Sequence, residues 1–126
     1  MRLRIFLLLL LVAAPIMPQT VHASPPRDLK LEYNVGTHTL SVKMKHPTIE
    51  AREHYIRTIT VTVNGGEPQV FHYTFQKLAA EFEATIPLSL NSGDNVVVKA
   101  TCRLGGSAEA ELTIPTADSD SESYGK

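Results

Sequence analysis

The sequence predicts an all-β fold, an immunoglobulin-like antiparallel β-sandwich of about seven strands. Three observations support this fold class. Short runs alternate apolar and polar residues, which is the period-two pattern of a strand with one buried face. Clusters of Gly, Asn, Asp and Pro separate these runs, as turns separate the strands of a sandwich. Helical periodicity is absent apart from a weak pattern at 76–82.

Seven segments of the chain show this alternation of apolar and polar residues and are predicted to be strands. The third run, 54–63, is rich in β-branched residues, and Asn64-Gly65 after it is a hairpin turn pattern. Ile56 is out of phase with Ile59, which predicts a β-bulge near Arg57-Thr58. The predicted strands are 28–34, 39–46, 54–63, 69–75, 81–87, 95–102 and 108–114. The positions expected to face the core are Leu29, Leu31, Tyr33, Leu40, Val42, Met44, Ile59, Val61, Val63, Phe71, Tyr73, Phe75, Phe82, Ala84, Ile86, Val96, Val98, Ala100, Cys102, Ala108, Ala110, Leu112 and Ile114.

The two ends of the chain lie outside this pattern. Residues 1–23 are predicted to be a secretory signal peptide, because a basic start precedes an apolar run and small or tolerated residues precede a cleavage point after Ala23. The apolar run is shorter than the about 20 residues that span a bilayer, so no membrane span is expected after cleavage. The sandwich domain is expected at 24–115, followed by a disordered acidic tail at 116–126. We therefore expect a periplasmic or secreted protein.

Composition excludes several classes of function. The chain has 13 acidic and 12 basic residues, and the basic ones are scattered, so no nucleic-acid partner is expected. No serine lies in a nucleophile-elbow pattern, which argues against a hydrolase. The paired glycines Gly65-Gly66 and Gly105-Gly106 lie in strand turns and do not form a phosphate-binding loop.

Histidine and cysteine supply the candidate chemistry. His46 ends one predicted strand and His54 begins the next, within the segment "HPTIEAREHYI". Cys102, the one cysteine of the chain, ends another strand before a glycine turn. Imidazole and thiolate are ligands for iron, copper and zinc. The loop between the two strands can bring His46 and His54 together, but spacing alone does not fix whether Cys102 lies at the same end of the sandwich. Cys102 is also in phase with Val98 and Ala100 and therefore fits a buried small apolar residue.

The segments "KHP…EHYI..I.V..NG" and "V.VKATC..GG" together resemble the ferrous-iron domain of the desulfoferrodoxin, or superoxide reductase, family. The resemblance runs from about Leu29 to Ile114. It implies an immunoglobulin-like sandwich with a mononuclear non-haem iron held by four histidines and one axial cysteine thiolate. His46 and His54 match two of those histidines, and Cys102 matches the thiolate. The implied partners are superoxide and an electron donor.

Two of the five ligands that this resemblance implies are missing at their matching positions. Gly105 stands where the family has a histidine, and the segment "SPPRDLK" has no counterpart of the family's N-terminal histidine. His38 and His72 remain open as replacements, although a turn position and a polar strand face favour solvent exposure for them. Superoxide reduction therefore stays open, and a redox or metal-handling role is the broader expectation.

An alternative is a non-catalytic immunoglobulin-like binding module. The segment "KHP…HYI..ITVTVNG" also resembles the sandwich subunit of the bacterial thiosulfate-oxidising carrier complex. That resemblance implies no metal and a protein partner. The strand-end position of Cys102 favours the iron family. A third alternative is an immunoglobulin-like protein that binds a partner protein along a sheet edge.

Overall fold

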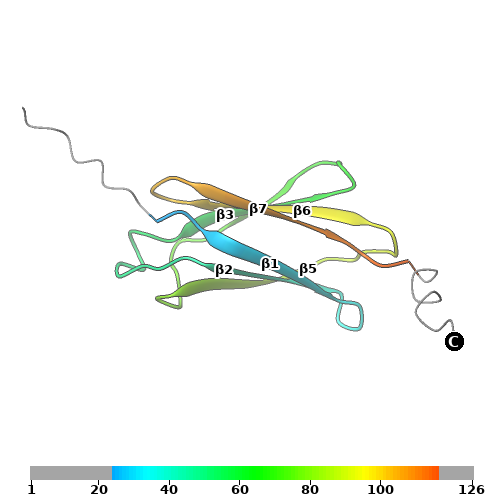
Figure 1. Cartoon of the computed structure of the whole chain (residues 1–126), viewed down its shortest axis with the longest axis horizontal. Helices are drawn as coiled ribbons and strands as arrows, with labels where there is room; N and C mark the ends of the chain where they lie inside the picture. The colour runs from blue at the N-terminus through cyan, green and yellow to red at the C-terminus, as the bar shows by residue number, and fades with distance from the viewer. Residues whose placement is uncertain (1–23, 117–126) are drawn as a thin grey trace, which may run out of the picture.

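The computed structural model describes residues 24–116, which form two antiparallel sheets packed face to face (Figure 1). Its strands are β1 (Arg27–Asn34), β2 (Thr39–Lys45), β3 (Ile56–Val63), β4 (Gln69–His72), β5 (Glu81–Pro87), β6 (Asn95–Cys102) and β7 (Ser107–Thr113). One sheet has the order β1-β2-β5 and the other β4-β3-β6-β7. The predicted fold class is confirmed. The predicted signal peptide, and the predicted tail beyond Thr116, lie outside the described residues.

The core lies between the sheets and follows the period-two pattern. Each inner strand contributes side chains that point inward at alternate positions, because successive residues of a strand face opposite sides of the sheet. The buried apolar residues are Leu40, Val42, Met44, Ile56, Ile59, Val61, Phe82, Ile86, Leu90, Val96, Val98, Ala100, Cys102 and Ile114. The edge strand β1 packs Leu29, Leu31 and Tyr33 only partly against this core.

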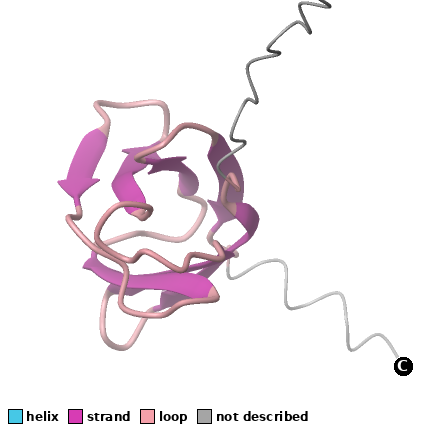
Figure 2. Ribbon diagram, turned by 90° about the vertical axis from the view of Figure 1, so that its left-hand side faces the viewer, coloured by secondary structure: helices cyan, strands magenta, loops and turns pink. Residues whose placement is uncertain are grey.

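Two crossovers between the sheets and one hairpin within the four-stranded sheet place three connections at one end of the sandwich, which we call the loop end. It consists of the segments 46–55, 73–80 and 103–106, which join β2 to β3, β4 to β5 and β6 to β7. The loop end is at the left of Figure 1 and faces the viewer in Figure 2. It follows that residues just after β2, just before β3 and at the end of β6 all lie at the same end of the molecule.

The predicted β-bulge is confirmed, since the pairing of β3 with β6 shifts register between Ile56 and Thr58. Two strand ends differ from prediction by more than one residue. The third strand starts at Ile56 instead of residue 54, because His54 closes a turn with the carbonyl of Glu50. The fourth strand ends at His72 instead of residue 75.

Phe75 was predicted to face the core, and this prediction is wrong: its side chain is 56% exposed. The chain leaves the sheet after Tyr73, whose amide still donates to the carbonyl of Arg57, and turns Gln76 inward instead. The weak helical pattern at 76–82 forms no helix. No helix within residues 24–116 has the length and apolar character needed to cross a membrane.

The hydroxyl of Tyr33 joins β1 to the β5–β6 connection. It donates to the carbonyl of Leu88 at 2.9 Å and accepts from the amide of Leu90 at 3.0 Å. We expect Tyr33→Phe to lower the free energy of unfolding by about 1–2 kcal/mol, since both backbone groups lose a partner in a partly buried place. Urea unfolding measures this change. Tyr73→Phe is the matched control, because its hydroxyl makes no hydrogen bond within residues 24–116, and equal losses in the two variants would contradict the assignment.

Candidate metal centre

His46, His54 and Cys102 converge at the loop end. One potential ligand atom from each lies within 4.8 Å of the others, and no other His, Cys, Asp or Glu of the described chain joins this group. His46 is fully buried and Cys102 is 2% exposed, whereas His54 is half-buried. The three side chains therefore form a compact cluster of two imidazoles and one thiol, largely shielded from water.

The position of His46 follows from β2. Its amide donates to the carbonyl of Ala80 at 3.1 Å, and the amide of Thr48 donates to the carbonyl of Ala79 at 2.7 Å. These bonds continue the pairing of β2 and β5 beyond the strand ends. His46 therefore keeps the alternation of the strand and lies on the same inward face as Met44.

Short turns place His54 and Cys102. The amides of Glu53 and His54 both donate to the carbonyl of Glu50, which holds His54 at the start of β3. Cys102 pairs in register with Ile56, and its amide donates to the carbonyl of Gly106 at 3.0 Å. Gly106 has a φ of 85°, and a Cβ there would lie 2.7 Å from the Cβ of Pro25, so glycine is required in this turn.

Gln76 determines which nitrogen of His46 is available. Its side-chain nitrogen donates to the carbonyl of His46 at 2.7 Å and to that of Leu78 at 2.8 Å. Its oxygen must therefore face the ring of His46, where it accepts from Nδ1 at 2.6 Å. In a neutral imidazole with the proton on Nδ1, Nε2 carries a free lone pair. This arrangement of a hydrogen-bonded second nitrogen is the usual one for metal-binding histidines.

Two nitrogen atoms of the cluster lack partners. Nε2 of His46 and Nε2 of His54 are both buried and make no hydrogen bond within the described structure. Buried polar atoms without partners are rare, because each costs about 1–3 kcal/mol. The rings lie edge to face with centroids 4.5 Å apart. Buried imidazole nitrogens without partners, beside a buried thiol, are suited to a metal ion.

The surroundings of His46 favour its neutral form. Burial lowers the pKa of His46 from its usual 6.5, the hydrogen bond to Gln76 opposes this shift, and the neighbouring His54 adds to it. The neutral ring is the form that binds metals.

Arg103 connects two of the loops next to the cluster. Its guanidinium donates to the carbonyl of Glu53 at 2.8 Å and contacts the Glu53 carboxylate at 3.1 Å. Its backbone amide donates to the carbonyl of Tyr55. These contacts connect the turn after Cys102 to the loop that carries His54.

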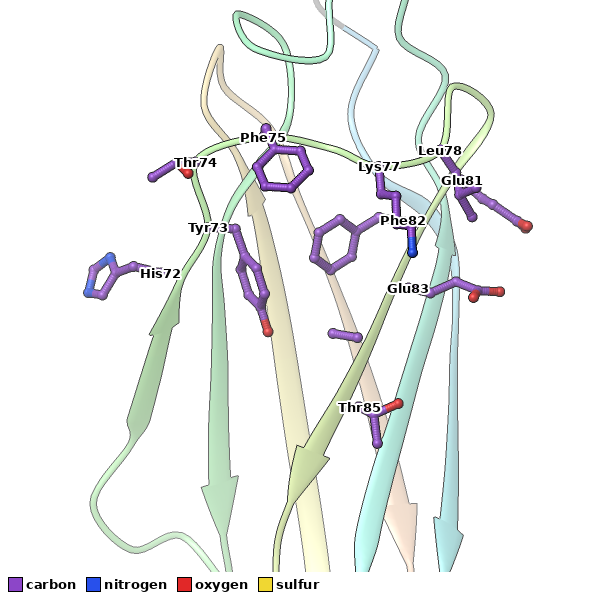
Figure 3. A pocket seen from close by; sticks show the side chains of 11 residues that line it. His72, Tyr73, Thr74, Phe75, Lys77, Leu78, Glu81, Phe82, Glu83 and Thr85 are labelled. Atoms are coloured by element: carbon purple, nitrogen blue, oxygen red, sulfur yellow. The ribbon is translucent and has the colours of Figure 1, made fainter.

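His38 and His72 do not join the cluster. His38 lies in the turn between β1 and β2, at the opposite end of the sandwich, and is exposed. His72 is exposed at the end of β4, and in Figure 3 its ring points away from the neighbouring aromatic side chains. Since Gly105 offers no side chain either, the described residues supply three ligand atoms. A five-ligand iron centre does not fit this set.

A groove lies beside the cluster, between the segment that follows β4 and strand β5 (Figure 3). It has a volume of about 590 Å³, and its aromatic wall includes Tyr73 and Phe82, whose rings lie edge to face 5.0 Å apart. Large apolar side chains are also exposed around the loop end. These residues, which we call the apolar rim, are Ile49, Phe75, Leu78 and Leu104. The sequence patterns gave no indication of the rim or of the role of Gln76.

Comparison with known proteins adds little beyond the fold. No family model matches the chain, and no curated protein matches it. One solved structure that is similar is described as a "Br derivative BhCBM56", with 23% identity, coverage of 75% of this chain and 97% of that chain, and a TM-score of 0.47. Similarity at this level does not bear on function.

The burial of neutral His46 predicts a pH-dependent stability of the metal-free protein. Because the folded state lowers the pKa of His46 below 6.5, the unfolded state binds more protons as the pH falls through that value. Stability is therefore full above pH 6.5 and decreases below it, by up to about 1.4 kcal/mol per pH unit for one proton. Urea unfolding with a chelator present, from about pH 8 to about pH 5, measures the slope.

The matched control for this measurement is His72→Gln, which should keep the slope because His72 is exposed. His46→Gln should flatten the slope, whatever its effect on stability at neutral pH. An unchanged slope in His46→Gln would show that another group titrates.

Gln76→Leu is expected to destabilise the protein by at least about 2 kcal/mol, because it leaves the carbonyls of His46 and Leu78 and Nδ1 of His46 without their partner. Urea unfolding gives the loss, and ¹⁵N NMR of the wild type should show His46 protonated on Nδ1. Gln69→Leu, at an exposed position of β4, is the control. A loss no larger than that of the control would contradict the structural role of Gln76.

Proposed function

We propose that this protein is an exported, non-catalytic β-sandwich that binds a transition metal through His46, His54 and Cys102 and acts in metal handling. One observation carries the proposal. Three ligand atoms lie within 4.8 Å of one another, and the buried Nε2 atoms of His46 and His54 lack other partners. The family resemblance points to the same three residues.

The spacing of the cluster is close to that of a bound metal. Three atoms that lie within 4.8 Å of one another share a centre no farther than about 2.8 Å from each. Metal bonds to imidazole nitrogen and thiolate sulfur are about 2.0–2.3 Å long. A contraction of about 0.5–0.8 Å is therefore enough. The half-buried His54, which lies on a loop, is the side chain best placed to move.

Superoxide reduction is not part of this proposal. In the family that the sequence resembles, iron has four histidines and a thiolate, and here two of those histidines have no equivalent among the described residues. A metal held by three side chains lacks the ligand field of such an iron. Binding, storage or delivery of a metal does not require four histidines and a thiolate.

A second candidate is a protein-binding module of the kind that the thiosulfate-oxidising carrier complex contains. The apolar rim favours it, because exposed apolar groups gathered on neighbouring loops are typical of protein contact surfaces. This candidate does not compete with metal binding for residues, since the rim side chains are outside the cluster.

Metal analysis of residues 24–126, purified without a histidine tag and reduced, tests the main proposal. We expect one metal ion per chain. Cys102→Ala should weaken binding by at least about 100-fold, since changes outside the ligand set already cost about 10- to 100-fold. His72→Ala is the matched control and should bind as the wild type does. Absence of stoichiometric metal after loading with iron, zinc and copper in turn would overturn the proposal.

A further inference from the structure

We infer that the metal selected by this centre is monovalent copper, Cu(I), in place of the iron that the family resemblance implies. The inference rests on the proposed function, because it concerns the same three residues. It follows from the number of ligands, from their charge and from the surroundings of His46 and Cys102.

The number of ligands is the first argument. Within residues 24–116 the cluster offers two imidazole nitrogens and one sulfur. Structural zinc takes four protein ligands in a tetrahedron, and Cu(II) prefers four in a plane. Cu(I) is a soft ion that thiolate ligands select, and it is stable with two or three ligands. Three side chains therefore complete the shell of Cu(I), whereas zinc held by the same three would need a fourth ligand such as water.

Neighbouring carboxylates do not fill the missing positions. The carboxylate nearest to His54 along the chain, that of Glu53, points to Arg103, with which it forms an ion pair at 3.1 Å. Glu50 uses its backbone carbonyl to close the turn, and its side chain lies at an exposed position. Hard oxygen ligands, which iron and zinc accept readily, are thus kept away from the cluster.

Charge is the second argument. Cys102 binds metal as a thiolate with one negative charge, and both imidazoles bind in their neutral form. Cu(I) makes the whole centre neutral, whereas a divalent ion leaves one net positive charge among His46 and Cys102, which are almost fully buried. An uncompensated buried charge is costly.

Gln76 strengthens the charge argument. Many metal-binding histidines donate their second nitrogen to a carboxylate, which adds negative charge around a divalent ion. Here the acceptor for Nδ1 of His46 is a neutral amide oxygen at 2.6 Å. Both amide hydrogens of Gln76 are used by the carbonyls of His46 and Leu78, so an acid at this position would lose those bonds. The residue that orients His46 is therefore suited to a monovalent ion.

Competition under anaerobic conditions tests the inference. The reduced, metal-free chain is titrated with Cu(I) buffered by bicinchoninate, and separately with Zn(II) and Fe(II) against a chelator. We expect one Cu(I) per chain, with a Kd at least about 100-fold below that for Zn(II) or Fe(II). X-ray absorption at the copper edge should show a three-coordinate ion with two nitrogen neighbours and one sulfur.

Gln76→Glu separates the charge effect from simple thiolate affinity. The added carboxylate should raise the affinity for Zn(II) by about 10-fold relative to that for Cu(I). Gln69→Glu, at an exposed position of β4, is the control and should leave the ratio unchanged. If Gln76→Glu does not fold, the wild-type competition alone decides.

The outcomes distinguish the two proposals. Failure to bind any of the three ions overturns metal binding itself. Tighter binding of Zn(II) or Fe(II) than of Cu(I), or a four-coordinate copper ion, overturns the selection of Cu(I) and leaves metal binding intact.

Discussion

The buried hydrogen bonds of Gln76 are the interaction on which the loop end depends. One amide side chain, 2% exposed, connects the carbonyl of His46, the ring of His46 and the carbonyl of Leu78. Its backbone amide also donates to the carbonyl of Ala51 at 3.0 Å. Gln76 therefore joins the segment 73–80 to the start and the middle of the segment 46–55, which carries the two histidines. The same bonds leave Nε2 of His46 without a hydrogen-bond partner and available to a metal. The hydrogen bonds of Gln76 therefore both hold the loops together and orient His46 as a ligand.

The sandwich topology brings the three ligand residues to the same end of the molecule. His46 continues the inward face of β2, and Cys102 occupies the last inward position of β6, one from each sheet. His54 precedes β3, which pairs directly with β6. The two sheets thus contribute to one cluster at the point where their strands end. A metal in this place would join the sheets, and any ligand that binds only the folded state stabilises it.

Sequence patterns predicted most of the sheet and the three residues of the cluster. Alternation extends through Met44 to His46 and through Ala100 to Cys102, so the inward direction of both ligands could be predicted from the strands alone. The bulge near Arg57 could be predicted too, because Ile56 and Ile59 cannot share a face without it. The strand positions and the family resemblance carried these predictions together.

The loop after β4 shows where such patterns stop being informative. Alternation continues from Phe71 to Phe75, yet the chain leaves the sheet after Tyr73, exposes Phe75 and buries Gln76. Hydropathy favours the opposite arrangement. The buried amide is stable because both of its polar atoms have partners, two of which are supplied by His46, distant in the sequence, and one by the nearby Leu78. A pattern of neighbouring residues contains no information about a partner 30 positions away.

The exposure of Phe75 and the burial of Gln76 are two consequences of one turn, and together they place an apolar surface beside a shielded polar centre. Gln76 faces the cluster, while Phe75 and Leu78 on the same loop belong to the apolar rim. Ile49 and Leu104 extend the rim from the loops that carry His54 and follow Cys102. Every segment that contributes to the cluster therefore also contributes an exposed apolar side chain. A partner that contacts the rim would therefore touch the same three loops that position the ligands.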